Sequence, residues 1–95
     1  MGAEQVIARI RAVMPELLKL GVTDLRLFGS HARGDATPES DVDLLVSLGR
    51  ADYAAYCRVL DLLEGALGGK VDLVMVEALK PAHRERVLNE AVRVA

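Results

Sequence analysis

The sequence is poor in the residues on which several common classes of protein chemistry depend. It has a single cysteine, Cys57, so no disulfide can form within the chain. It has no tryptophan, two tyrosines and one phenylalanine, which leaves few aromatic surfaces for stacking single-stranded nucleic acid. Because Cys57 lies in an apolar helical pattern, we expect it to be a small buried core residue rather than a reactive thiol.

An excess of basic residues and long apolar runs are also missing. Twelve Lys and Arg against fourteen Asp and Glu give a net charge of −2, which argues against nucleic acid as the main ligand, since that binding needs a basic surface. No apolar stretch approaches the roughly 20 residues of a membrane span. The first residues lack the basic-then-apolar shape of a signal peptide. We therefore expect a cytoplasmic protein that does not contact membranes.

What the sequence has is enough apolar material for a real core. Hydrophobic residues make up 52% of the 95 residues and charged residues 27%. This length fits one domain over residues 1–95, without repeats or an internal linker. Because a domain of this size folds with a modest margin of stability, a partner surface is expected, in either a homo-oligomer or a hetero-oligomer.

The spacing of apolar residues predicts an element order αβ(α)βαβα. The predicted elements are a helix over 4–20 that Pro15 kinks or restarts, strands over 22–28, 42–48 and 71–76, a short helix opening at Ser30, a helix from the N-cap Asp52 to Gly68-Gly69, and a last helix from Pro81. The nearly continuous apolar run of the second strand indicates that both its faces are covered.

The last helix is predicted to have a buried face and a charged face. The residues expected to be buried are Val87, Leu88, Ala91 and Val92. The residues expected to face solvent or a partner are Arg84, Glu85, Arg86, Glu90 and Arg93.

The positions of the carboxylates carry the functional information. Asp41 and Asp43 are two residues apart on a predicted strand, so both point to the same face. Their apolar neighbours make a poor environment for charge, which is costly to bury unless a cation or hydrogen bonds compensate. Asp72 repeats this arrangement in the third strand. If that strand lies beside the second, the three carboxylates converge.

Three hard oxygen ligands without a Cys or His cluster suit Mg²⁺ or Mn²⁺ rather than zinc. Such a site can hold two ions about 3.5–4 Å apart, which clamp the attacking and leaving oxygens of a phosphoryl displacement.

Gly29 and Ser30 provide the second half of the predicted site. A glycine at the end of a strand lets the backbone approach a ligand closely, and a helix that begins at Ser30 offers N–H groups to an anion. Arg33 follows in the same segment and can reach a phosphate with two nitrogens. Taken alone, Asp41 is equally compatible with a solvated strand boundary; the combination favours a metal-nucleotide site. His31 is expected to be a surface group, and His83 has no motif around it.

Two runs carry a resemblance to a known family: residues 27–34 (LFGSHARG) and 40–46 (SDVDLLV). They resemble the nucleotidyltransferase superfamily related to DNA polymerase β, and in particular the small prokaryotic minimal nucleotidyltransferases (MNT). Gly29-Ser30, ten intervening residues and Asp-x-Asp form the shared pattern, and Asp72 matches the third acid. The resemblance covers nearly the whole chain.

The resemblance implies an α/β (α+β) fold with a small mixed sheet and helices packed on it. It also implies transfer of a nucleoside monophosphate from a nucleoside triphosphate, with pyrophosphate leaving. On this basis Asp41 and Asp43 bind both metal ions. Asp72 binds the catalytic ion and helps to deprotonate the acceptor hydroxyl. Ser30 and the Gly29 backbone hold the triphosphate.

The same resemblance implies a partner. Larger members of the superfamily carry an added acceptor-binding domain, for which these 95 residues have no room. MNT proteins pair with helical HEPN toxins, and members with this pattern are linked to transfer of AMP from ATP onto a toxin tyrosine. Two alternatives stay open: nucleotidyl transfer to a small molecule such as an aminoglycoside, and a non-catalytic partner that masks a toxin.

Overall fold

A four-stranded mixed sheet organises the chain. The computed structural model describes residues 2–37, 39–49 and 52–94. The strands are β1 (Val22–Phe28), β2 (Val42–Leu48), β3 (Val71–Met75) and β4 (Val92–Arg93), in the spatial order β3-β2-β1-β4. β1 is antiparallel to both β2 and β4, whereas β2 and β3 are parallel. The mixed sheet implied by the resemblance is confirmed.

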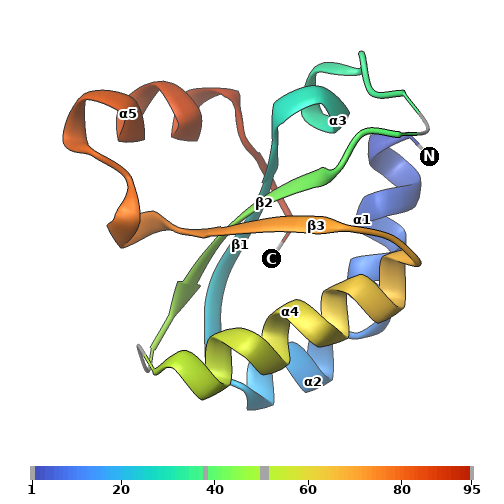
Figure 1. Ribbon diagram of the computed structural model, residues 1–95, viewed down its shortest axis with the longest axis vertical. Helices are drawn as coiled ribbons and strands as arrows, with labels where there is room; N and C mark the ends of the chain where they lie inside the picture. The colour runs from blue at the N-terminus through green and yellow to red at the C-terminus, as the bar shows by residue number, and fades with distance from the viewer. Residues whose placement is uncertain (1, 38, 50–51, 95) are drawn as a thin grey trace.

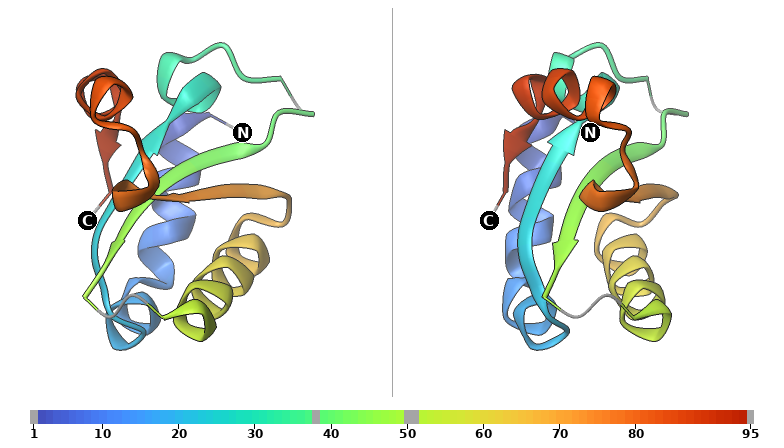
Figure 2. Two further views of the ribbon diagram at one scale, coloured as in Figure 1. Left: turned by 60° about the vertical axis from the view of Figure 1, so that its left-hand side comes forward. Right: turned by 90° about the vertical axis from the view of Figure 1, so that its left-hand side faces the viewer.

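Three of the helices pack on one face of this sheet and form the core with it. The helices are α1 (Ala3–Ala12), α2 (Met14–Lys19), α3 (Gly29–Arg33), α4 (Tyr53–Leu67), the 3₁₀ turn η1 (Val76–Ala78) and α5 (Pro81–Glu90). α1, α2 and α4 contribute buried aliphatic side chains to the core, where Ile10, Leu17 and Leu63 meet the strand residues Leu27 and Leu44. α3 and α5 lie near each other at one end of the sheet (Figures 1 and 2).

Alternation along the strands explains which residues enter the core. In β2, Leu44 and Val46 face the helices and are fully buried. Leu45 points to the opposite face and is also fully buried. The prediction that β2 is covered on both faces is therefore confirmed.

The segment predicted as one helix over 4–20 is two helices. α1 ends at Ala12, and Val13 separates it from α2, which begins at Met14 with Pro15 in its first turn. Proline has no N–H to continue the hydrogen-bond ladder of α1, but it is well tolerated at the start of a new helix. The predicted start of a new helix at Pro15 is confirmed, although the helix begins one residue earlier, at Met14.

The ends of α4 follow the predicted signals. The Asp52 carboxylate accepts a hydrogen bond from the Ala55 N–H at 2.7 Å, and Gly68 ends the helix with φ +70°. The predicted full burial of Cys57 is wrong, because it is only half-buried. Cys57 lies two residues from the buried Val59, about 200° around the helix, and therefore turns away from the core.

The C-terminal end differs from the prediction. α5 ends at Glu90, Ala91 is extended, and Val92 lies in β4 with 40% of its surface exposed. No residue of α5 is fully buried; Val87 and Leu88 are half-buried, and so is Arg84, which was expected to be exposed. Ala91 is half-buried like Val87 and Leu88, whereas the predicted burial of Val92 is wrong because Val92 pairs with Leu27 of β1 in a strand.

Two smaller boundaries also shift. β3 ends at Met75, since Val76 begins η1, and α3 begins at Gly29 rather than Ser30. Within the described residues, no helix has the length and apolar character required to cross a membrane.

Candidate active site

The predicted carboxylates lie where the end of β1 is adjacent to the starts of β2 and β3 in the sheet. We call this end of the sheet the carboxylate edge. In the strand register, Phe28 at the end of β1 lies opposite Asp43, and Asp43 lies opposite Asp72 of β3. Paired residues on adjacent strands are about 5 Å apart, so Asp43 and Asp72 are neighbours. Asp41 lies two residues before Asp43, just ahead of β2. The structure therefore brings the three predicted acids to one edge.

Burial distinguishes Asp43 from the other two acids. Asp43 is half-buried, whereas Asp41 and Asp72 are exposed, so the expectation of an apolar environment holds for Asp43 alone. Burial raises the pKa of Asp43, and the negative charges of Asp72 and Asp41 raise it further, while His31 acts in the opposite direction. The site is thus a concentration of negative charge that a cation would relieve.

Gly29 lies in direct contact with Asp43. Its φ is +73°, in the left-handed region that glycine adopts readily. A Cβ at this position would collide with Asp43 Oδ2 and lie 2.9 Å from its Cγ. Both the backbone conformation and the contact therefore require glycine, and they hold the turn after β1 against the central carboxylate.

Ser30 and Arg33 lie in the short helix α3 that follows this turn. Ser30 is half-buried, and its carbonyl accepts hydrogen bonds from Gly34 at 2.9 Å and Asp35 at 3.0 Å, which fold the next segment back on the helix. Arg33 is exposed, with its Nε 3.3 Å from Asp35 Oδ2. An ion pair this exposed is weak, so Arg33 can exchange Asp35 for a phosphate.

His31 is the residue that sequence reasoning placed wrongly. It was expected on the surface, but it is 4% exposed, and its Nδ1 has no hydrogen-bond partner among the described residues. The spacing of α3 held a signal, because Ser30 and Arg33 are three apart and share one helix face. The two residues between them, His31 and Ala32, therefore turn inward, and His31 is the more buried of the two.

The donor set fits a divalent cation. Among residues 2–37, 39–49 and 52–94, no three acidic, His or Cys side chains already converge as a metal cage. Asp41 and Asp72 are exposed, and their charges act on Asp43, with which Asp72 also shares a side-chain hydrogen bond, so the three carboxylates are close enough to serve one cation. Carboxylate oxygens are the ligands that Mg²⁺ and Mn²⁺ prefer.

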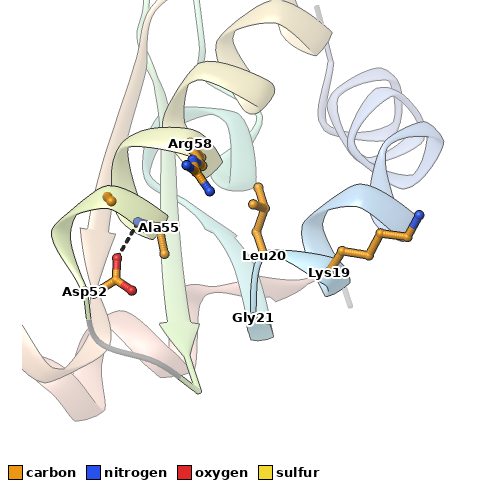
Figure 3. Close-up of a pocket in the computed structure, with 7 residues that line it drawn as sticks. Lys19, Leu20, Gly21, Asp52, Ala55 and Arg58 are labelled. Atoms are coloured by element: carbon orange, nitrogen blue, oxygen red, sulfur yellow. Dashed lines mark hydrogen bonds between the residues drawn. The ribbon is translucent and has the colours of Figure 1, made fainter.

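A pocket of about 350 Å³ lies away from the carboxylates, at the start of β1, between α2 and the start of α4 (Figure 3). Lys19 and Arg58 line it, and its one carboxylate, Asp52, is held by the Ala55 N–H. Gly21, just before β1, also lines it, so the pocket is a full strand length from Gly29. It has no cluster of acids, and the carboxylate edge remains the candidate active site.

Known proteins are similar to this chain in both sequence and fold. A protein from Thermococcus cleftensis, named protein adenylyltransferase MntA, is 39% identical over 77 residues, which cover 80% of this chain and 78% of the relative. A solved structure described as a minimal nucleotidyltransferase is 41% identical with a TM-score of 0.86, over 97% of this chain and 95% of the other.

A more distant match is the solved complex of a tri-AMPylated HEPN toxin from Shewanella oneidensis with an MNT antitoxin. The identity is 19% and the TM-score 0.68, over 98% of this chain and 71% of the other, so this likeness shows the fold alone. Residues 7–94 match the nucleotidyltransferase domain. With the close relatives above, this match shows that the chain belongs to the nucleotidyltransferase domain family.

Proposed function

We propose that this chain is a Mg²⁺-dependent nucleotidyltransferase that moves AMP from ATP onto a hydroxyl of a partner protein, as the antitoxin of a HEPN toxin. One observation supports the chemistry above all: Asp43 lies against the Gly29 turn, with Asp72 beside it in the sheet and Asp41 two residues ahead of it, just before β2 begins. A triphosphate held at the turn thus lies next to three oxygen ligands.

In the proposed reaction, the acceptor oxygen attacks the α-phosphorus of ATP. The bond between that phosphorus and the oxygen bridging to the β-phosphate breaks, and pyrophosphate leaves. Asp72 takes the proton of the acceptor hydroxyl. Gly29, Ser30 and Arg33 orient the triphosphate, and Asp41, Asp43 and Asp72 hold Mg²⁺. When bound, Mg²⁺ supplies neutralisation of the charge on the phosphates.

The relatives support a protein as the acceptor. The Thermococcus relative is named a protein adenylyltransferase, and the Shewanella structure pairs an MNT antitoxin with an AMPylated HEPN toxin. The chemistry at Asp43 is the same for a small-molecule acceptor, so only an assay with the partner distinguishes the two. The gene next to this one identifies the partner to use.

The test incubates the chain and that partner with Mg²⁺ and ATP and measures the mass of the partner. We expect a gain of one or more AMP groups with the wild type and none with Asp41→Asn or Asp43→Asn. Asp61→Asn, an exposed change on α4, is the matched control and should transfer normally. Toxin neutralisation by Asp41→Asn and Asp43→Asn, without any mass gain for the wild type, would show a masking partner instead of an enzyme.

A further inference from the structure

His31 is a buried polar side chain with a ring nitrogen whose hydrogen-bonding capacity is unsatisfied. Only 4% of its surface is exposed, and Nδ1 has no hydrogen-bond partner among the described residues. A buried polar atom without a partner destabilises the folded state, so a leucine of similar size would be the more stable choice at this position. A role in binding or catalysis accounts for a histidine at this position.

The position of His31 connects the two halves of the site. In the chain it follows Ser30 of the triphosphate-binding turn, and it is close enough to Asp43 for its charge to act on that carboxyl. It also lines a cavity of about 230 Å³ together with Thr37, Ser40 and Asp41. One side chain therefore adjoins the turn, the central acid and the segment that carries Asp41.

Thr37 and Ser40, before Asp41, have few hydrogen bonds to other described residues. Thr37 and Ser40 bind mainly to each other, with the Thr37 N–H donating to Ser40 Oγ at 2.9 Å and the Ser40 N–H donating to the Thr37 carbonyl at 3.0 Å. A second cavity, of about 290 Å³, adjoins His31 and is also lined by Gly34 and Ala36. His31 thus lines both cavities, and the first of them also adjoins Thr37 and Ser40. The first cavity is large enough for bridging water between Nδ1 and the polar groups around it.

We propose that His31 is a positioning residue for nucleotidyl transfer: its Nδ1 supports Thr37 and Ser40 across the cavity and so fixes Asp41 relative to Asp43 when the metal-nucleotide complex binds. This inference rests on the proposed function of the site. His31 itself touches neither metal nor substrate in this role.

The test compares three variants by calorimetric binding of Mg²⁺ with a non-hydrolysable ATP analogue, which needs no acceptor. His31→Leu fills the same space without a polar atom, and we expect it to weaken binding by about 10–100-fold, the usual loss when a supporting residue is removed. Its melting temperature should stay equal or rise. His31→Asn keeps a nitrogen at the Nδ1 position and should bind like the wild type. His83→Leu, exposed on α5, is the control and should change neither quantity.

Each outcome decides between roles. Wild-type binding by His31→Leu, or equal losses in His31→Leu and His31→Asn, overturns the inference. A fall in melting temperature that accounts for the loss in His31→Leu shows a purely structural role. If the wild type binds no metal-nucleotide complex, the proposed function itself is wrong. If the wild type binds the complex and His31→Leu binds it equally well, only the inference about His31 is wrong.

Discussion

Gly29 and Asp43 are in contact across the sheet edge, and each limits what the other can be. The glycine takes a φ of +73° and leaves no room for a Cβ beside the carboxylate. The carboxylate in turn is half-buried next to two further acids, so its charge depends on what binds there. At the scale of single residues, the site is a close contact between the turn proposed to bind phosphate and a destabilised negative charge.

Replacing Gly29 with alanine separates backbone strain from this contact. Gly34→Ala is the matched control, because Gly34 has a φ of +84° and open space where its Cβ would stand. Both variants should lose about 1–2 kcal/mol from the strained φ. Only Gly29→Ala also displaces Asp43, so it should lose more stability and most of its transfer activity. Urea unfolding and the AMP-transfer assay check this; equal activities in the two variants would contradict it.

The pKa of Asp43 predicts a pH dependence of stability. Its pKa is raised in the folded state from an ordinary value of 3.8, so the folded state holds more protons between the two pKa values. The free energy of unfolding therefore falls as the pH rises through that window. Asp43→Asn removes this loss and should be more stable than the wild type at pH 7 without metal.

The measurement is urea unfolding with a chelator present, from pH 7 down toward 3.8. The advantage of Asp43→Asn should shrink as the pH falls, because the wild-type carboxyl then becomes protonated and neutral. Asp61→Asn provides the baseline for removing an exposed carboxylate. An advantage that is constant with pH, or that grows at low pH, would show that Asp43 is not the group responsible.

The residues of the site differ in how far the sequence predicts them. Asp41 and Asp43 could be placed together because strand alternation and the apolar runs around them are local signals. Asp72 joins them only because β3 pairs with β2, which the sequence left as a condition. The burial of His31 could not be predicted with the same ease. Its inward direction depends on α3 beginning at Gly29, and helix starts are less certain from sequence than helix interiors.

At the scale of whole elements, the C-terminal strand shows what local patterns miss. β4 contains only Val92 and Arg93, too few residues to show alternation. The apolar residues that end the chain fit a helix equally well when read alone. Pairing with Leu27 and Arg26 of β1 decides in favour of the strand, a tertiary effect that no local pattern records. By contrast, the ends of α4 were predictable, because Asp52 and Gly68 are local capping signals.

The two valines at this end provide a matched test of the strand. Val94 is 4% exposed and its N–H donates to the Leu25 carbonyl at 2.8 Å, whereas Val92 is 40% exposed. Val94→Ala should lower the free energy of unfolding by about 1.5–3 kcal/mol, from lost burial and a small cavity. Val92→Ala should change it by about 0.5 kcal/mol or less. Equal effects in urea unfolding would favour the continued helix predicted from the sequence.

At the scale of the whole molecule, one face of the sheet carries the core and one edge carries the charge. α1, α2 and α4 pack on the core side of the sheet, and the carboxylate edge lies outside this core, where the proposed metal-nucleotide complex can reach it. Stability and ligand binding are therefore linked, because a ligand that binds only the folded state stabilises it. The repulsion among Asp41, Asp43 and Asp72 makes this link depend on a cation as well as on the nucleotide.

Thermal unfolding with each ligand alone and with both measures this link. At about 100 times its dissociation constant, a metal-nucleotide complex adds about 2.7 kcal/mol of stability. For a domain of this size, that raises the melting temperature by about 10–20 °C. Nucleotide with a chelator should give a much smaller rise, since the triphosphate then adds negative charge to the acids. Asp43→Asn should lose most of the metal-dependent part. An equal rise with and without Mg²⁺ would mean that the triphosphate binds away from these three carboxylates, whose repulsion Arg33 alone is too little to offset.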